Sequence, residues 1–290
     1  MFVEACRNVL ELGQSAFVIG HPVAHSRSPM LHRFWLRSLG LPGQYDAVDV
    51  APKALGSFIA GLRDAGFVGG NVTLPHKQAV FAHLGRVEPE AAAIGAVNTI
   101  WTEGGTLVGG NTDAYGFLAN LDEQAPGWDA GRGLAVVLGA GGAARAASYG
   151  LRQRGMRVHL ANRTAASAEA VAAKLGPPAS AGSLDGLPRL LPHAELLVNT
   201  TVLGMVGKPP LALDLAPLQA GAVVCDIVYV PLVTPLLAAA AARGHRVADG
   251  LGMLLHQGAP GFARWFGQVP AVTLELRALL VADIGRAPGG

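Results

Sequence analysis

The segment "VVLGAGGAARAA", residues 136–147, constrains the fold more than any other part of this chain. Glycines stand at 139 and 141 and an alanine at 144, which is a G-x-G-x-x-A arrangement. An apolar run precedes it, a helix-forming run opens inside it, and the β-branched run "RVHLAN" follows within about 30 residues. Glycines in that setting permit a tight turn and let backbone amides approach a pyrophosphate at the helix N-terminus. We therefore predict a Rossmann-like βαβ unit that binds a dinucleotide.

The end of the second strand of that unit indicates which dinucleotide binds. Asn162, Arg163 and Thr164 stand where enzymes that use NAD place an acidic residue. An acidic side chain there accepts hydrogen bonds from the ribose 2′-hydroxyl, whereas a guanidinium pairs with a 2′-phosphate. The "NRT" segment therefore favours NADP over NAD. The alternative is that the glycine loop is structural and that Arg163 extends from the surface into water.

The hydrophobic pattern predicts the domain organisation. Short β-branched runs alternate with Ala- and Leu-rich stretches, which is typical of an α/β fold with parallel sheets. The first series has strands near 16–20, 44–50 and 67–73 and helices over 30–39, 52–65 and 76–84, and a second series begins at Leu134. We predict an N-terminal α/β substrate domain over 1–112 and a Rossmann-like nucleotide domain over 113–249. The C-terminal helices, 250–290, are predicted to pack back on the substrate domain.

Composition argues against several classes of function. The formal net charge is +2 and no Lys/Arg cluster is present, so we expect no nucleic-acid partner. No segment reaches the roughly 20 apolar residues of a membrane span, and Glu4, Arg7 and Glu11 interrupt the N-terminal segment where a signal peptide would be apolar. Cys6 and Cys225 are isolated and have no metal-ligand spacing. We therefore expect no metal site and a reducing, cytoplasmic location.

A pair of serines in the N-terminal domain is the first candidate for chemistry. In "GHPVAHSRSPMLH", Ser26 and Ser28 stand two apart before Pro29 and a predicted helix. An extended chain points both hydroxyls to one side. Two hydroxyls beside a helix N-terminus suit a carboxylate, although in isolation a capping role is the more usual explanation.

The second candidate is Lys77 in "GGNVTLPHKQ", the only formally charged residue between Asp64 and Arg86. Apolar surroundings disfavour the charged form of a lysine and a nearby carboxylate favours it. A lysine under both influences exchanges protons near neutral pH, as the reduction of a carbonyl requires. Taken alone, a lysine at a helix N-terminus that reaches water is the simpler explanation.

Several shorter polar residues complete the candidate set. Asp113 stands at a predicted helix start, where a negative charge is favourable without any catalytic role. Thr73, Asn98 and Asn111 stand at strand ends, where turn and capping roles are usual. Their combination, rather than any one of them, indicates a functional site.

In combination, these stretches resemble the shikimate dehydrogenase family. The matching blocks run in family order from about Gly20 to Gly267 and are "GHPVAHSRSPMLH", "GGNVTLPHK", "GAVNTI", "GGNTDAYG", "GAGGAARA", "NRT", "DIVYVPLVTPLL" and "GLGMLLHQGAPGFARWFG". The resemblance implies the NADPH-dependent reduction of 3-dehydroshikimate to shikimate, a step of aromatic amino acid and chorismate biosynthesis.

The resemblance also implies roles by motif position. Lys77 would be the catalytic acid/base, with Asp113 fixing its ammonium, and Ser26 and Ser28 would hold the substrate carboxylate. The ring hydroxyls would be bound by Thr73, Asn98, Asp113, Tyr229 and Gln257. NADP would be held by Gly139, Ala140, Gly141, Gly142, Ala143, Asn162, Arg163, Thr164 and Ser167, with Ile227 and Gly250 beside the nicotinamide.

The nearest alternative is a quinate/shikimate dehydrogenase that uses NAD. Arg163 argues against NAD, and Ser28 argues against quinate because some quinate-using relatives resemble this motif with Thr there. A relative of shikimate that carries an amino group stays open as the substrate. A homodimer stays open as the oligomeric state. A non-catalytic regulatory protein on the same fold would be expected to lack the lysine or the aspartate. The chain departs from the family pattern at Arg33, at Val202 and in its N-terminal extension.

Overall fold

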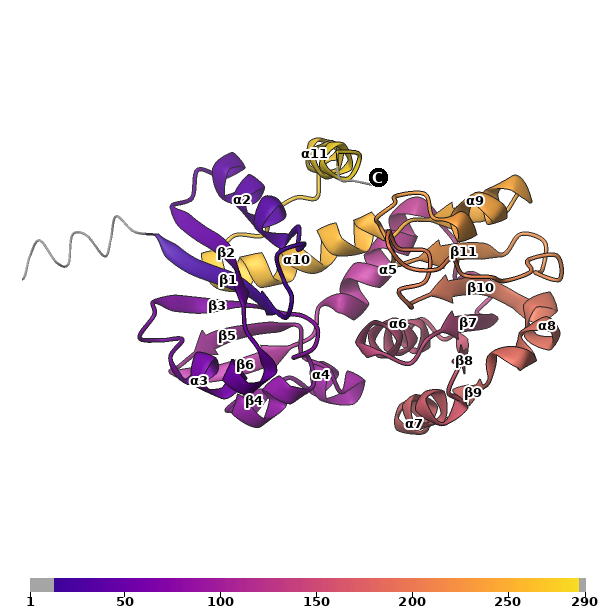
Figure 1. Cartoon of the computed structure of the whole chain (residues 1–290), viewed down its shortest axis with the longest axis horizontal. Helices are drawn as coiled ribbons and strands as arrows, with labels where there is room; N and C mark the ends of the chain where they lie inside the picture. The colour runs from indigo at the N-terminus through magenta and orange to yellow at the C-terminus, as the bar shows by residue number, and fades with distance from the viewer. Residues whose placement is uncertain (1–12, 287–290) are drawn as a thin grey trace, which may run out of the picture. The chain divides into compact units, whose positions relative to one another are not determined.

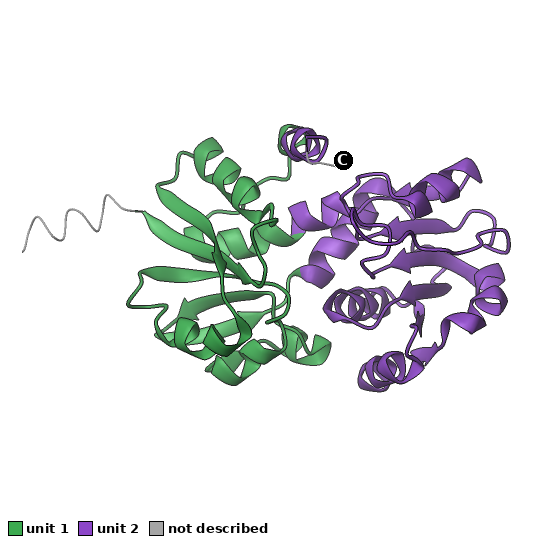
Figure 2. Cartoon of the chain, viewed as in Figure 1, with its two compact units in different colours: residues 1–112, 257–276 green, residues 113–256, 277–290 purple. Residues whose placement is uncertain are grey.

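The computed structural model describes residues 13–286, which form two compact units (Figures 1 and 2). Unit 1 takes the chain up to Thr112 together with Gln257–Leu276. Unit 2 takes Asp113–His256 and the chain from Arg277 onward. Cys6, the charged residues near the N-terminus and the last four residues lie outside the described residues. The assignment of a substrate role and a nucleotide role to domains with the predicted boundaries stays a prediction.

Unit 1 is built on a mixed sheet with the strand order β2-β1-β3-β5-β6-β4. Strand β1 is parallel to both β2 and β3, and the hairpin of β5 and β6 follows with β5 antiparallel to β3. The strands are β1 (Gln14–Gly20), β2 (Gly43–Asp49), β3 (Phe67–Val72), β4 (Arg86–Val87), β5 (Thr99–Glu103) and β6 (Thr106–Gly110). Its helical elements are α2 (Ser28–Ser38), η1 (Pro52–Ala54), α3 (Leu55–Ala60), η2 (Ala79–His83) and α4 (Pro89–Ile94).

From Gln257 onward, helix α10 (Leu251–Phe266) belongs to unit 1, where its aromatic residues are buried. The Trp265 indole N–H donates to the carbonyl of Ile100, at 2.9 Å, and fastens the helix to β5. Phe262 and Trp35 of α2 meet edge to face with ring centroids 5.5 Å apart. A Cβ at Gly258 would lie 2.7 Å from a methyl carbon of Leu31, so glycine permits this close approach of α10 to α2.

Unit 2 has an all-parallel sheet with the order β12-β11-β10-β7-β8-β9. Read from β9, this is the order 3-2-1-4-5-6 of a dinucleotide-binding fold, and it confirms the predicted Rossmann-like class. The strands are β7 (Leu134–Leu138), β8 (Arg157–Ala161), β9 (Ser180–Gly182), β10 (Ala194–Asn199), β11 (Val223–Asp226) and β12 (Arg246–Ala248). The helices are α5 (Asp113–Gln124), α6 (Gly142–Gln153), α7 (Ala165–Leu175), η3 (Leu184–Gly186), α8 (Leu187–Leu190), η4 (Leu191–His193), α9 (Pro235–Ala242) and, from Leu274 to Ile284, α11.

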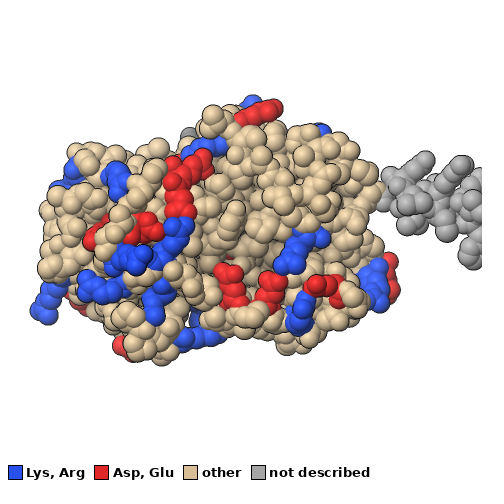
Figure 3. Space-filling model, turned by 180° about the vertical axis from the view of Figure 1, so that it is seen from behind, with Lys and Arg blue, Asp and Glu red and all other residues tan. Residues whose placement is uncertain are grey.

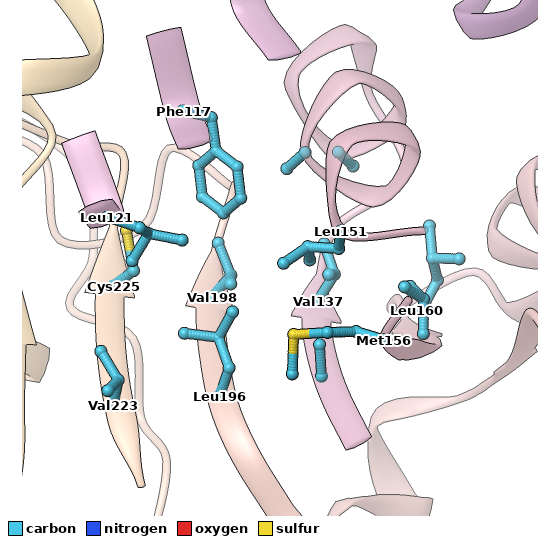
Figure 4. Packing of buried hydrophobic residues seen from close by; sticks show 14 of the residues in the cluster. Phe117, Leu121, Val137, Leu151, Met156, Leu160, Leu196, Val198, Val223 and Cys225 are labelled. Carbon is cyan, nitrogen blue, oxygen red and sulfur yellow. The ribbon is translucent and has the colours of Figure 1, made fainter. Parts of the chain in front are cut away.

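One hydrophobic core cluster of unit 2 lies where α5 and α6 cover the central strands (Figure 4). Phe117 and Leu151 reach from these helices onto Val137 and Val198, and all four are fully buried. Each such side chain contributes about 1.5–3 kcal/mol on leaving water. Strands buried on both faces read as continuous apolar runs, which is why "LAVVL" and the "LLV" of β10 predict central strands.

The helix predicted over residues 76–84 is wrong. The structure has turns from Pro75 and a 3₁₀ helix over Ala79–His83. In an α-helix, the carbonyl of Lys77 would accept from the N–H of the residue four positions later. Here it accepts instead from the N–H of Val97, at 2.8 Å. The side chain of His76 contacts the carbonyl of Val50 at 2.6 Å. Pairing with distant backbone therefore replaces the local helix.

Basic and acidic side chains are interspersed on the face seen in Figure 3, with broad uncharged areas between them. Arg154 and Asp129 form one of the ion pairs of the described residues, with 2.9 Å between nitrogen and oxygen. Within residues 13–286, none of the helices combines the length and the apolar character that crossing a membrane demands.

Candidate active site

One end of the sheet of unit 1 gathers most of the predicted substrate residues. The carboxyl ends of the parallel strands β1 and β3 meet there, as does the amino end of the antiparallel strand β5. Ser26 and Ser28 follow β1, Thr73 and Lys77 follow β3, and Asn98 directly precedes β5. Residues far apart in the sequence are thus brought to one place by the strand directions alone.

The segments after β1 and β3 are in direct contact. The N–H of His21 donates to the carbonyl of Leu74 at 3.0 Å. A Cβ at Gly20 would lie 2.6 Å from the methyl carbon of Thr73. Glycine at position 20 therefore lets the threonine side chain lie against the end of β1.

The serine pair stands at the start of α2. The Ser26 hydroxyl oxygen accepts the N–H of Ser28, the first residue of the helix, at 3.3 Å. Ser26 thus satisfies one backbone donor of the helix start, but the N-cap residue is Arg27 and not either serine, and Ser28 is buried. The remaining donors at this helix start favour an anion beside the two hydroxyls.

Asp49 holds the loop that carries the serines. Its Oδ2 accepts the N–H of Val23 at 3.2 Å, and its Oδ1 lies 2.6 Å from Nδ1 of His21. The hydrogen bond with His21 lowers the pKa of the Asp49 carboxyl from its usual value. The loop is therefore tied to the end of β2 as well as to the segment after β3.

Lys77 is half-buried, and its backbone is fixed by the bond from Val97 described above. Asn98, the next residue after Val97, is buried with 2 % of its surface exposed. Its Oδ1 accepts the N–H of Thr112 at 2.8 Å, and its Nδ2 donates to Oε1 of Gln257 at 3.3 Å. The structure therefore brings together Asn98 and Gln257, which lie 159 residues apart.

Asp113 is the first residue of α5 and is 5 % exposed. It follows Thr112 directly in the chain, and Thr112 is bonded to Asn98. A carboxylate in the first turn of a helix is stabilised by the helix dipole. Asn111, the remaining polar candidate, donates from Nδ2 to the carbonyl of Ala96 at 2.8 Å, which is a structural role.

In unit 2, the predicted nucleotide residues lie at the carboxyl ends of the parallel strands. Gly139 directly follows β7 with φ of +116°, and a Cβ there would lie 2.7 Å from Oγ1 of Thr200, so only glycine fits. Gly141 is the N-cap of α6, and a Cβ there would meet no atom within 4 Å. Ala140 lies in the turn, and Gly142 and Ala143 are the first two residues of α6. An exposed helix N-terminus with open space in front of its glycine suits a phosphate.

The end of β8 carries the basic segment of the prediction. Asn162 donates from its side chain to the carbonyl of Thr164 at 3.0 Å, which shapes the turn into α7. Arg163, Thr164 and Ser167 follow Asn162 at this strand end. A dinucleotide fold meets the ribose of the adenosine at the end of this strand, so the pairing of Arg163 with a 2′-phosphate stays a prediction.

Ile227 and Gly250, which follow β11 and β12, lie against each other. A Cβ at Gly250 would lie 2.2 Å from the carbonyl oxygen of Ile227. The N–H of Ile227 donates to the carbonyl of Asn199 at 3.0 Å. Tyr229 stands two residues farther on and is partly buried.

The sequence interpretation missed a buried carboxylate beside this segment. Asp226 is fully buried and accepts from Thr234 Oγ1 at 2.7 Å, Asn199 Nδ2 at 2.9 Å and the N–H of Val228 at 3.0 Å. Burial raises the pKa of its carboxyl to about 6. The sequence signal was the single acidic residue at the end of the apolar run "AVVCD".

Asn71 and Thr112 were also missed. Asn71 lies inside β3 and is buried, so in the sequence it is one polar residue in an apolar strand.

The structure also explains Arg33. Its Nε donates to the carbonyl of Tyr45 at 3.0 Å and its guanidinium pairs with Asp46, so it ties α2 to β2.

Comparison with known proteins agrees with this geometry. The family model described as "Shikimate dehydrogenase substrate binding domain" matches residues 18–100, and "Shikimate 5'-dehydrogenase C-terminal domain" matches residues 250–280. The chain is 56 % identical over 268 residues to a shikimate dehydrogenase (NADP(+)) of Azorhizobium caulinodans, covering 92 % of this chain and 95 % of the relative.

Solved structures give the same result. Shikimate 5-dehydrogenase from Thermus thermophilus, in complex with NADP(H) and shikimate, aligns with a TM-score of 0.81 at 41 % identity, covering 95 % of this chain and 100 % of that one. A quinate dehydrogenase from Corynebacterium glutamicum in complex with NAD aligns with a TM-score of 0.85 at 30 % identity, covering 92 % and 99 %. With identities above half over nearly its whole length, the chain belongs to the shikimate dehydrogenase family.

Proposed function

We propose that this protein catalyses the reversible, NADP-dependent reduction of 3-dehydroshikimate to shikimate. The observation that carries the proposal is the convergence of paired serines, Lys77 and the Asn98–Gln257 pair at one end of the unit 1 sheet. The relatives that share more than half of its residues bear the name of this activity. The product supplies the biosynthesis of chorismate and aromatic amino acids.

The residues of unit 2 fit NADP. Gly139 permits the tight turn, and the open space in front of Gly141 leaves room for a pyrophosphate at the N-terminus of α6. Arg163 would pair with the 2′-phosphate, with Asn162, Thr164 and Ser167 beside it. When bound in its reduced form, the cofactor supplies a hydride to the carbonyl carbon. Ile227 and Gly250 would line the nicotinamide side.

The residues of unit 1 fit a polyhydroxylated carboxylate. The hydroxyls of Ser26 and Ser28 would donate to the carboxylate at the start of α2. Thr73, Asn98 and Gln257 would bind ring hydroxyls, with Asp113 and Tyr229 as further partners. Short neutral polar groups suit such a substrate because each hydroxyl both donates and accepts a hydrogen bond.

Lys77 would carry the proton chemistry. Reduction of a ketone leaves negative charge on its oxygen, which an adjacent ammonium stabilises and protonates. In the reverse direction, the neutral amine takes the proton from the hydroxyl. Asp113 is the proposed carboxylate partner of this lysine. The sequence contains two isolated cysteines, which is typical of proteins of a reducing compartment such as the cytoplasm.

Steady-state oxidation of shikimate and of quinate, each with NADP and with NAD, tests the proposal. We expect turnover to be highest for shikimate with NADP. Higher kcat/KM for quinate with NAD would replace this function with that of a quinate dehydrogenase. An absence of turnover in all four combinations would refute both.

A further inference from the structure

A chain of buried polar side chains runs through unit 1 behind Asn98. The Tyr45 hydroxyl of β2 lies 2.5 Å from Oδ1 of Asn71 on β3. Nδ2 of Asn71 lies 3.3 Å from Oγ1 of Thr99, and that oxygen lies 2.9 Å from Oδ1 of Asn98. Tyr45, Asn71 and Thr99 are 0 %, 5 % and 1 % exposed. Polar groups so buried must be satisfied by one another, because water does not reach them.

Backbone groups fix the direction of this chain at two points. Nδ2 of Asn71 faces the carbonyl oxygen of Asn98 at 3.2 Å, and a carbonyl only accepts. Oδ1 of Asn71 therefore faces Tyr45, whose hydroxyl must donate. The N–H of Thr112 faces Oδ1 of Asn98 at 2.8 Å, and a backbone N–H only donates. The carboxamide of Asn98 therefore has one allowed orientation.

The direction of the hydrogen bonds of Thr99, which lies between Asn71 and Asn98, follows from these two fixed orientations. The Thr99 hydroxyl accepts from Asn71 and donates its own proton to Oδ1 of Asn98. Nδ2 of Asn98 is then turned toward Oγ1 of Thr112, at 3.0 Å, and Oε1 of Gln257, at 3.3 Å. We infer that Tyr45, Asn71 and Thr99 are positioning residues that hold Asn98 with Nδ2, and not Oδ1, on the side of Gln257, where the substrate is proposed to bind. This inference rests on the proposed function for its ligand.

The surroundings of Tyr45 keep its hydroxyl, the first donor of this hydrogen-bonded series, protonated. The ring of His32 stacks on that of Tyr45 with centroids 4.0 Å apart and an interplanar angle of 14°. Burial raises the pKa of the Tyr45 hydroxyl, and burial lowers the pKa of His32 to about 3. At neutral pH a protonated phenol therefore lies against an uncharged imidazole. Neither group reverses the direction of the chain in the working range of pH.

The fixed orientation has a consequence for specificity. Both N–H groups of Asn98 already have acceptors in this structure, so a ligand atom that meets Nδ2 takes the place of Oε1 of Gln257. That atom must accept a hydrogen bond, as a hydroxyl or ketone oxygen does. A group that only donates would leave an N–H facing another donor, which costs affinity. Tyr45 on β2 and Asn71 on β3 therefore determine, through Thr99, that Asn98 presents a donor and not an acceptor.

The chain can be tested without any substrate. The side-chain NH₂ signals of Asn71 and Asn98 in the ligand-free protein are identified by NMR through their loss in Asn71→Asp and Asn98→Asp. We expect both groups to exchange slowly with water in the parent protein. Thr99→Val should speed exchange at Asn98, and Tyr45→Phe should speed it at Asn71. Unchanged exchange at Asn98 in the Thr99→Val variant would overturn the inference, whatever the substrate.

Kinetics test the consequence for the ligand. Thr99→Val should raise KM for shikimate by roughly 5- to 10-fold, the loss of one hydrogen bond, and leave KM for NADP unchanged. Thr99→Ser keeps the hydroxyl and should restore KM, which a role in packing alone would not explain. Thr102→Val, an exposed change on the same strand, is the control. An unchanged KM for shikimate in Thr99→Val would refute the positioning role. A parent protein that does not oxidise shikimate would refute the proposed function, while the NMR result still decides the inference.

Discussion

The backbone N–H of Val97 donates a 2.8 Å hydrogen bond to the carbonyl oxygen of Lys77. Val97 directly precedes Asn98, so two residues of the candidate site are tied through adjacent backbone. This bond uses the carbonyl that an α-helix would need at that point. The backbone of Lys77 is therefore held by the segment that directly precedes β5 and not by a helix of its own.

Replacing Lys77 with Met tests its catalytic role. Met keeps the length of the apolar stem and removes the ammonium, so kcat should fall by roughly 10²- to 10⁴-fold. KM for NADP and the melting temperature should hardly change, because a neutral side chain relieves desolvation. Lys53→Met, an exposed change in η1, is the matched control. A stable Lys77→Met variant with nearly full kcat would contradict the mechanism.

The sequence predicts the parts of this molecule whose signals are local. The order of β7, α6 and β8 follows from apolar strands around a Gly-rich turn, and the structure confirms it. The irregular segment after Lys77 could not be predicted, because the bond that replaces the helix comes from Val97. A helix-forming run carries no information about a distant donor.

The same distinction separates the site residues that were predicted from those that were missed. Thr73 and Asn98 stand at strand ends, where a polar residue attracts attention. Asn71 and Asp226 are buried at positions where the sequence shows one polar residue in an apolar run. Their partners, Tyr45 and Thr234, come from other elements, so only the folded chain shows that they are satisfied.

Replacing Ser28 with Ala should mainly raise KM for shikimate. The change removes one hydrogen bond to a charged carboxylate, worth roughly 1.5–3 kcal/mol, or about 10- to 100-fold. The methyl ester of shikimate should be a poor substrate of the parent enzyme for the same reason. Ser38→Ala, at the other end of α2, should leave KM unchanged. Equal turnover of the ester and the acid would show that Ser28 serves the helix only.

Replacing Arg163 with Asp should weaken the use of NADP far more than it lowers kcat. A carboxylate would repel the 2′-phosphate that the guanidinium pairs with, and KM for NADP should rise by roughly 100-fold or more. Arg157→Asp, at the opposite end of β8, tests whether loss of positive charge alone has this effect. Initial rates at varied NADP provide the measurement, and an unchanged KM in Arg163→Asp would refute the cofactor assignment.

Two glycines of the same loop should respond differently to alanine. At Gly141, φ is −80° and a Cβ meets nothing within 4 Å, so Gly141→Ala should fold normally. Its methyl group would occupy the space proposed for the pyrophosphate and raise KM for NADP. Gly139→Ala combines a φ of +116° with a contact to Thr200 and should lower the melting temperature. Normal NADP binding by a stable Gly141→Ala variant would place the pyrophosphate elsewhere.

Asp226 should make stability depend on pH in the direction opposite to most acidic residues. Its pKa is raised from 3.8 to about 6 because the carboxyl is buried, so the folded state binds the proton more tightly than the unfolded state does. The stabilisation that this group contributes is full below pH 3.8 and is lost as pH rises to about 6. The total loss is of the order of 3 kcal/mol, since one pKa unit corresponds to about 1.4 kcal/mol.

Replacing Asp226 with Asn removes the titration and keeps the shape. The Asn oxygen can accept from Asn199 and Val228 at the position of Oδ1, and the Asn nitrogen can donate to the Thr234 hydroxyl. Urea unfolding of the two proteins between about pH 4.5 and about 7.5 measures the difference, which cancels the acids common to both. We expect the variant to gain stability relative to the parent as pH rises to about 6, and the difference to stay constant above that. A difference that does not change with pH would mean that Asp226 is ionised throughout, held by its three donors despite its burial.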